Sequence, residues 1–175
     1  MQLKSLKGCR LTIGSYPPFS YNASGGGGQG TLISNQNNIF YLSFSSKTFY
    51  IPPLTYKNTN FLSIPLPPGL KIDMHMDKLE GTVDKSSGEV LFKFEAQFIF
   101  SIGGMIKFPN LLVKTKLTTG RVKGKLHEAE GVSLQKNGTT KLVGISIIPQ
   151  TRNKILDTFL GLPNEALAEL HCEIK

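Results

Sequence analysis

One stretch of the sequence, EVLFKFEAQFIF at residues 89–100, carries apolar side chains at nearly every second position. On a β-strand its even-numbered residues would share one face: Val90, Phe92, Phe94, Ala96, Phe98 and Phe100. Most of the polar residues fall on the opposite face. Strands of a parallel sheet are covered on both faces and are apolar throughout, so this alternation predicts antiparallel strands with one face in a core and the other in water.

The same alternation recurs elsewhere in the chain. Two hairpins are predicted, one turning at residues 84–88 and one at residues 136–138, where an Asn-Gly pair suits a type I′ turn. In the strand predicted after the second turn, Val143, Ile145 and Ile147 stand at every second position and would share one face. Prolines in 51–56 and 64–72 cannot donate to a β-ladder, so these segments are expected to cross an end of the sheet.

Two predictions concern the C-terminal part of the chain. Apolar residues at helical spacing, followed by Gly161 and Pro163, predict one short helix within residues 151–162. Residues 164–175 alternate perfectly and are predicted to form a final strand, although Ala, Glu and Leu also favour a helix. Such a strand can pair with residues 11–13 and remove the exposed sheet edges.

These elements predict an all-β, mainly antiparallel fold. The expected architecture is a single-domain β-barrel over residues 1–175, calycin-like in outline, with one short C-terminal helix. A two-sheet β-sandwich is the alternative. Lys4, Lys7 and Arg10 interrupt any apolar run at the N-terminus, so a soluble, cytoplasmic protein is expected.

The sequence indicates little redox or metal chemistry. Cys9 and Cys172 stand near opposite ends of the chain, and His75, His127 and His171 are isolated from one another. No cofactor or metal is therefore expected. Asp73, His75 and Asp77 would share one strand face, a spacing that suits a divalent ion or an acid–base pair, but also the wet face of any strand. No nucleophile motif or carboxylate pair supports an enzyme.

The stretch YPPFSYNASGGGGQG, residues 16–30, combines aromatic residues with four consecutive glycines. A phosphate-binding loop would need Lys followed by Ser or Thr after the last glycine, and this pair is missing. Poly-glycine is costly to order, so the stretch is expected to stay mobile. Tyr16, Phe19 and Tyr21 would either cap the mouth of the barrel or pack on its exterior.

The interior of such a barrel is either a filled core or the wall of an apolar pocket. The favoured hypothesis is a non-enzymatic protein that binds a small apolar or amphipathic molecule, such as a lipid, isoprenoid or pigment. Its lining would comprise two groups of residues, one from the interior and one from the mouth: Phe92, Phe94, Phe98, Phe100 and Met74, and Tyr16, Phe19 and Tyr21.

The charge distribution supports a competing hypothesis. The net charge is +8, and neither residues 1–72 nor residues 96–127 contain an acid. A basic face at Lys114, Lys116, Arg121 and Lys123 would dock on an acidic protein or an anionic membrane surface. Specific nucleic-acid binding is not expected, because this basic run carries a single aromatic residue, Phe108. The sequence does not predict an oligomeric state.

Four stretches together resemble a family of uncharacterised proteins from cyanobacteria and plastid-bearing organisms: IPPLTYKNTNFLSIPLPPGLKI, LEGTVDKSSGEVLFKFEAQF, VKTKLTTG and DTFLGLPNEALAEL. The resemblance covers most of the chain and implies a setting, without implying an activity or catalytic residues. The chain is similar to lipocalins only in its expected architecture, because it has no Trp for their G-x-W motif.

Overall fold

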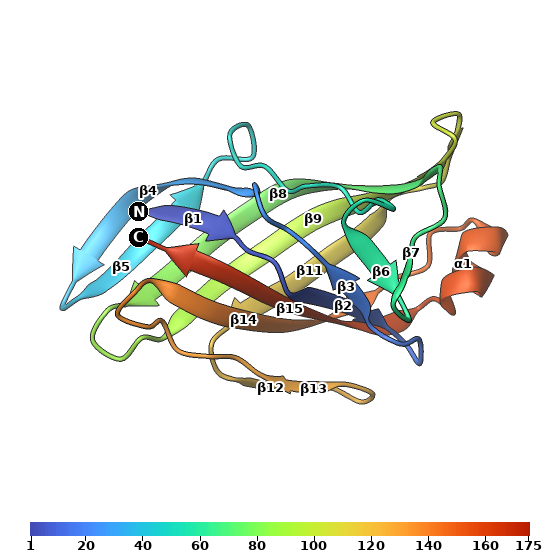
Figure 1. The fold of residues 1–175 in the computed structure, drawn as a ribbon. Helices are drawn as coiled ribbons and strands as arrows, with labels where there is room; N and C mark the ends of the chain where they lie inside the picture. Colours follow the sequence, from blue (N-terminus) through green and yellow to red (C-terminus); the bar gives the residue numbers. More distant parts are fainter.

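A computed structural model describes all residues, 1–175 (Figure 1). Strands make up 58% of the chain and helix 4%, so the all-β prediction is confirmed. The strands are β1 (Gln2–Ser5), β2 (Cys9–Ile13), β3 (Phe19–Tyr21), β4 (Gly27–Gln36), β5 (Ile39–Phe44), β6 (Thr59–Phe61), β7 (Ile64–Pro65), β8 (Leu70–Asp84), β9 (Val90–Ile102), β10 (Ile106–Lys107), β11 (Leu111–Thr118), β12 (Arg121–Lys123), β13 (Glu128–Glu130), β14 (Thr139–Ile148) and β15 (Asn164–Ile174). The helix is α1 (Lys154–Leu160).

Eight strands form a closed ring, in the order β1-β4-β5-β8-β9-β11-β14-β15. Pairing of Leu3 in β1 with Ile174 in β15 closes the ring, and the neighbouring strands are antiparallel. The barrel is therefore the observed architecture and the two-sheet sandwich is not. Closure leaves this ring without a free edge.

A second set of strands completes one end of the barrel. β2 also pairs with β15, with Leu11 opposite Ala168, as predicted for the final strand. β3, β6 and β7 continue the sheet from β2, and Leu54 forms a bridge to Ile72 of β8. We call the end beside α1 and the β6–β7 turn the mouth half, and the end at the β4–β5 hairpin the filled half; Figure 1 shows them at opposite ends of the molecule.

The first predicted hairpin forms, whereas the residues before the second turn form no strand and make only an isolated bridge, from Val132 to Lys141 of β14. β8 and β9 pair along their length around residues 85–89. At the second turn only Gly138 has positive φ, at 89°, whereas a type I′ turn needs positive φ at both central residues. Gly138 N–H donates to the Gln135 carbonyl at 2.9 Å, and Gln135 N–H donates to the Thr139 carbonyl at 2.9 Å. This is the pattern of a three-residue loop, in which a turn over residues 135–138 ends in a glycine bulge.

The C-terminal predictions are confirmed. Asn153 caps α1, since its side chain accepts from Leu156 N–H, and Gly161 ends the helix with φ 63°. β15 pairs over ten residues with β14, from Asn164 opposite Ile148 to Glu173 opposite Thr139. The helix alternative for residues 164–175 is therefore wrong.

The prediction of a mobile glycine stretch is wrong. Gly27, Gly28 and Gly30 belong to β4, and β4 pairs with both β1 and β5. A Cβ at Gly27 would lie 2.0 Å from the Leu3 carbonyl oxygen, and one at Gly30 would lie 2.9 Å from the Phe44 ring. Glycine is required here because the neighbouring backbone and rings approach too closely for a side chain.

The core divides into three clusters. The largest fills the filled half and contains Leu42, Phe44, Val83 and Phe92. Two smaller clusters lie in the mouth half, one around Tyr21, Leu54 and Met74 and one around Leu111, Ile148 and Leu160. A domain of this size usually has one contiguous core, so the division itself indicates a space between the clusters.

Candidate functional site

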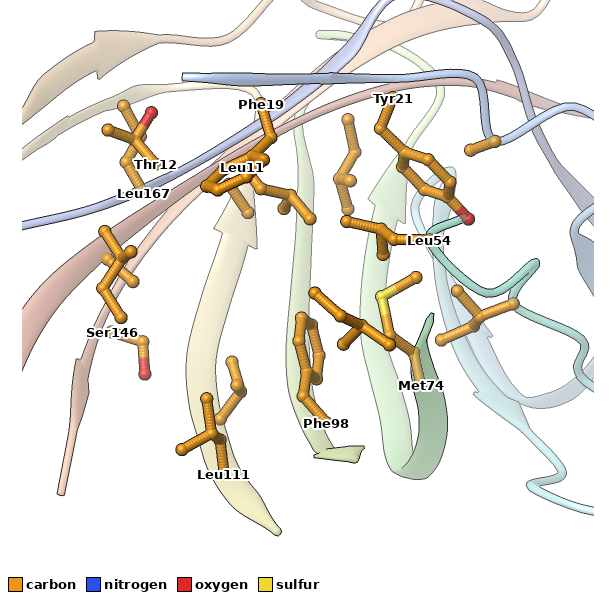
Figure 2. A pocket seen from close by; sticks show the side chains of 18 of the residues that line it. Leu11, Thr12, Phe19, Tyr21, Leu54, Met74, Phe98, Leu111, Ser146 and Leu167 are labelled. Carbon is orange, nitrogen blue, oxygen red and sulfur yellow. The ribbon is translucent and has the colours of Figure 1, made fainter. Parts of the chain in front are cut away.

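The barrel encloses an apolar cavity of about 690 Å³. Of the 41 residues that line it, 34 are hydrophobic. Figure 2 shows the walls: Met74, Phe98 and Leu111 project from β8, β9 and β11, while Phe19 and Tyr21 come from β3. Ligand sites in proteins have volumes of about 300–1,000 Å³, so this cavity has the size of a small-molecule site.

Small side chains on β14 and β15 account for the space. Gly144, Ser146, Ala166 and Ala168 line the cavity, and Gly144 is directly opposite Ala168 in the ladder. Farther along the same two strands, Leu142 and Ile174 are large and belong to the filled-half cluster. The cavity therefore lies where β14 and β15 carry too little side-chain volume to fill the space beside the phenylalanines of β9.

The sequence-based interpretation missed these small residues. The alternation of Val143, Ile145 and Ile147 drew attention to the outward face of β14, and Ile147 is 62% exposed. The inward face of β14 is formed by Leu142, Gly144, Ser146 and Ile148, all of which line the cavity. Val143 is nevertheless fully buried, because β12 packs over β14. The sequence feature that could have identified this cavity wall is the run of small residues at every second position: Gly144 and Ser146 in β14, and Ala166 and Ala168 in β15.

The structure places every predicted ligand-binding residue on the cavity wall: Phe92, Phe94, Phe98, Phe100, Met74, Tyr16, Phe19 and Tyr21. Phe98 and Phe100 pack against both mouth-half clusters and so bridge the two sides of the cavity. Phe92 lies at the inner limit, where it is fully buried in the filled-half cluster. That these residues contact a ligand stays a prediction.

The aromatic residues near the mouth have different environments. Tyr21 is buried and its hydroxyl donates to the Pro52 carbonyl. Burial raises the pKa of Tyr21 well above its ordinary value. Phe19 packs on Phe61 with ring centroids 4.8 Å apart. Tyr16 is partly exposed, its hydroxyl donates to the Phe159 carbonyl, and it therefore ties the loop after β2 to α1 at the mouth.

Charge is absent from the cavity wall. No Asp, Glu, Lys, Arg or His lines the cavity. Two of its hydroxyl groups already have backbone partners: Ser146 Oγ donates to the Lys114 carbonyl at 2.9 Å, and Thr115 Oγ1 to the Ile145 carbonyl at 2.7 Å. A buried ion without a partner is strongly unfavourable, so the wall selects against an enclosed charge.

Asp73, His75 and Asp77 do not assemble into a site. Asp73 forms an ion pair with Lys71 at 2.7 Å, and both Asp77 carboxylate oxygens accept from the Gln97 amide. A β-bulge between Met76 and Lys78 places Asp77 outside the regular register. No three His, Cys, Asp or Glu residues in the structure lie together as metal ligands would. On the opposite face of β8, Ile72, Met74 and Met76 are buried.

The predicted basic face is exposed but partly neutralised. Lys114 and Lys116 point outward from β11, and Lys114 pairs with Glu95 at 3.1 Å. Arg121 and Lys123 lie on β12, where Arg121 forms an ion pair with Glu128 of the adjacent β13. The acids that follow residue 127 in the sequence therefore lie beside the cations that precede it. Docking of this face stays a prediction.

The hairpin that carries Arg121 and Lys123 is anchored by one buried carboxylate. Glu165 of β15 accepts hydrogen bonds from three backbone N–H groups, those of Lys125, Leu126 and His127, at 2.7–3.0 Å. Desolvation would raise the pKa of Glu165, but these donors outweigh it and lower the pKa below the ordinary value. Glu165 thus fixes the hairpin over β14.

The two cysteines are buried free thiols. Burial raises the pKa of Cys172 to about 12 and also raises that of Cys9. The Cys9 thiol donates to the Leu6 carbonyl at 3.4 Å. Thiols with raised pKa values are poor nucleophiles, so both act as small core residues.

Comparison of the chain with protein-family models, with curated proteins and with solved structures gives no significant match. The resemblance to a cyanobacterial and plastid family therefore stays an expectation, and no site residue is assigned by likeness. The only helix has seven residues, and no helix here is long and apolar enough to span a membrane.

Proposed function

We propose that this protein binds one small apolar molecule, or the apolar part of an amphipathic one, inside the mouth half of the barrel. The observation that carries the proposal is the cavity of about 690 Å³ with no charged residue on its wall. A lipid chain, an isoprenoid or a pigment has the required chemistry. The proposed role is binding, since no arrangement of catalytic groups faces the cavity.

The driving force would be the release of water from an apolar wall. Water in a cavity needs two to four polar partners, and this wall offers few that are not already bonded. Each methylene of a ligand that replaces water there contributes about 0.8 kcal/mol. Phe94, Phe98 and Phe100 supply flat, polarisable surfaces along which a chain or a conjugated system can lie.

The uncharged wall also predicts selectivity. A carboxylate taken into the cavity would lose its hydration without gaining a cationic partner. A neutral ester should therefore bind better than the matching ionised acid, unless the charged group of the acid stays outside the mouth.

Titration with Nile red, an uncharged dye that fluoresces in apolar surroundings, tests the proposal. The protein should bind the dye saturably, and a neutral lipid should displace it. Ala168→Phe places a ring in the cavity and should weaken binding by about tenfold or more. Leu112→Phe is the matched control, because Leu112 points outward from β11 and its substitution should leave binding unchanged. Absence of saturable binding, or equal binding by both variants, would contradict the proposal.

The alternative function, docking through the basic face, has weaker support. Two of its four cations are ion-paired with neighbouring carboxylates. If this face nevertheless binds an acidic protein or an anionic membrane, binding should weaken steeply with salt and with Lys116→Glu.

A further inference from the structure

The mouth of the barrel carries an unusual number of exposed apolar side chains. They come from four segments that are separate in sequence: Tyr16, Leu62, Ile64, Met105, Ile106, Ile155 and Phe159. Met105 is 90% exposed and Ile155 is 73% exposed. Figure 1 shows the β6–β7 turn, the loop between β9 and β10, and α1 gathered at this end. We call these seven residues the mouth rim.

The local structure presents these side chains instead of burying them. Gly103 and Gly104, with φ 62° and 74°, turn the chain between β9 and β10, and a Cβ at either position would meet nothing within 4 Å. The loop therefore projects into open space and carries Met105 at its tip. A projecting apolar tip gains nothing from the rest of the fold, which points to a contact outside it.

The helix α1 is apolar on two faces. Leu156 and Leu160 are buried against the barrel, whereas Ile155 and Phe159 are four residues apart on the outward side and exposed. A surface helix normally turns a polar face to solvent. An apolar outward face is characteristic of helices that lie in a membrane interface.

The mouth rim is continuous with the cavity. Tyr16, Leu62, Ile64 and Phe159 are exposed and also line the cavity. The cavity therefore reaches the surface among the rim residues, and whatever covers the rim also faces the cavity opening.

Charge around the mouth rim favours an anionic surface. Lys107, Arg152 and Lys154 are exposed and form no ion pair in the structure. The only acid in residues 99–109 and 150–163 is Asp157. Its carboxylate accepts hydrogen bonds from the backbone N–H and hydroxyl of Thr151 and from the backbone N–H of Arg152. Cations beside apolar side chains match the headgroups and chains of an anionic bilayer.

We propose that the mouth rim docks on the surface of an anionic lipid membrane, with Met105, Ile155 and Phe159 entering the acyl region and the nearby cations contacting headgroups. In this orientation the cavity opens toward hydrocarbon, so an apolar ligand passes between membrane and cavity without crossing water; this second step rests on the proposed function. Docking itself depends only on the chemistry of the rim.

Sedimentation with lipid vesicles tests the docking. The full-length protein should bind vesicles of phosphatidylcholine mixed with phosphatidylglycerol, and bind pure phosphatidylcholine more weakly, with the difference reduced at high salt. Met105→Asp and Phe159→Asp should each weaken binding by about tenfold or more. Ile33→Asp is the matched control: Ile33 is 60% exposed on β4 in the filled half, and its substitution should have no effect.

Each contrary outcome has a distinct meaning. Failure of the wild-type protein to bind either vesicle, or equal losses from Met105→Asp and Ile33→Asp, would overturn the docking proposal. Nile red binding without vesicles is measured in parallel. Vesicle binding without dye uptake would overturn the proposed function but leave docking standing, and dye uptake without vesicle binding would do the reverse.

Discussion

The filled half and the mouth half of the barrel share strand β9 but use its phenylalanines in different ways. In the filled half, Phe92 meets Phe44 edge to face with ring centroids 5.7 Å apart, and Phe44 meets Phe49 in the same way at 5.6 Å. In the mouth half, Phe98 and Phe100 face the cavity. The difference arises from the partners across the barrel and not from the phenylalanines themselves.

Two features of the filled half explain its close packing. Glycines in β4 let β1 and the rings of Phe44 and Phe49 approach closely. Leu142, Cys172 and Ile174 supply volume from β14 and β15. In the mouth half the same two strands supply Gly144, Ser146, Ala166 and Ala168. The filled half is therefore closely packed, and the mouth half contains the cavity.

The largest contrast should appear in alanine substitutions on β9. Phe92→Ala removes a fully buried ring and should lower the free energy of unfolding by about 3–5 kcal/mol. Phe98→Ala, on the cavity wall, should lower it by only about 1–2 kcal/mol, because its ring is only partly buried and faces a space that already exists. Urea denaturation measures both. Equal losses would show that the two halves are equally packed.

Substitutions of two glycines, one in β4 and one just before it, should show how much the close packing of the filled half depends on the absence of a side chain. Gly27→Ala brings a Cβ against the Leu3 carbonyl oxygen and should lower the free energy of unfolding by about 2–3 kcal/mol. Gly25→Ala has a similar positive φ of 92° but meets nothing within 4 Å, so it should cost clearly less. A comparable loss in both variants would mean that backbone strain, and not the approach of β1, requires glycine at position 27.

A smaller effect is expected at the anchor of the β12–β13 hairpin. The folded-state pKa of Glu165 is lowered, so its contribution to stability is present above its ordinary pKa of 4.5 and is lost as pH falls through the lowered value. Glu165→Gln should lower the free energy of unfolding by about 1–2 kcal/mol near neutral pH. It should also make the free energy of unfolding depend less on pH in the acid range, called here the acid limb. An unchanged acid limb, measured by denaturation across pH, would contradict this account of the anchor.

The smallest effect is expected on the outer face of β11. Lys116 is exposed and opposite Lys93 in the ladder, so Lys116→Glu should change the free energy of unfolding by no more than about 0.5 kcal/mol. It should also leave Nile red binding unchanged, since Lys116 does not line the cavity. A loss of dye binding would mean that the outer face of β11 belongs to the ligand site, and it would contradict the assignment of that site to the cavity in the mouth half.

The sequence predicted the fold mostly through features that are local. The alternation in β9 and β15, and the end of the helix at Gly161 and Pro163, depend on spacing within a short segment. The pairing of the last strand with residues 11–13 is long-range, and it was predicted because it removes the exposed sheet edges. The glycines of β4 were misread because their reason is non-local: Leu3 and Phe44, which approach them, are distant in the chain. Period-two patterns also do not show which face turns inward when both are apolar, as in β14.

The candidate site was predictable only in part. The phenylalanines of β9 and the aromatics at residues 16–21 were found because large apolar residues stand out. The cavity itself depends on small residues opposite them, and register between distant strands decides which residues meet. The rim was missed for a similar reason, since the segments that carry Met105, Leu62 and Phe159 are far apart in the sequence and lie at the same end only in the folded molecule (Figure 1).

Native mass spectrometry of the gently purified protein tests the central claim most directly. We expect an added mass that organic extraction removes, that returns on incubation with a neutral lipid, and that Ala168→Phe lacks. A ligand-free species in every case, including after incubation with lipid, would show that the mouth half is an unused space and would contradict the proposed binding function.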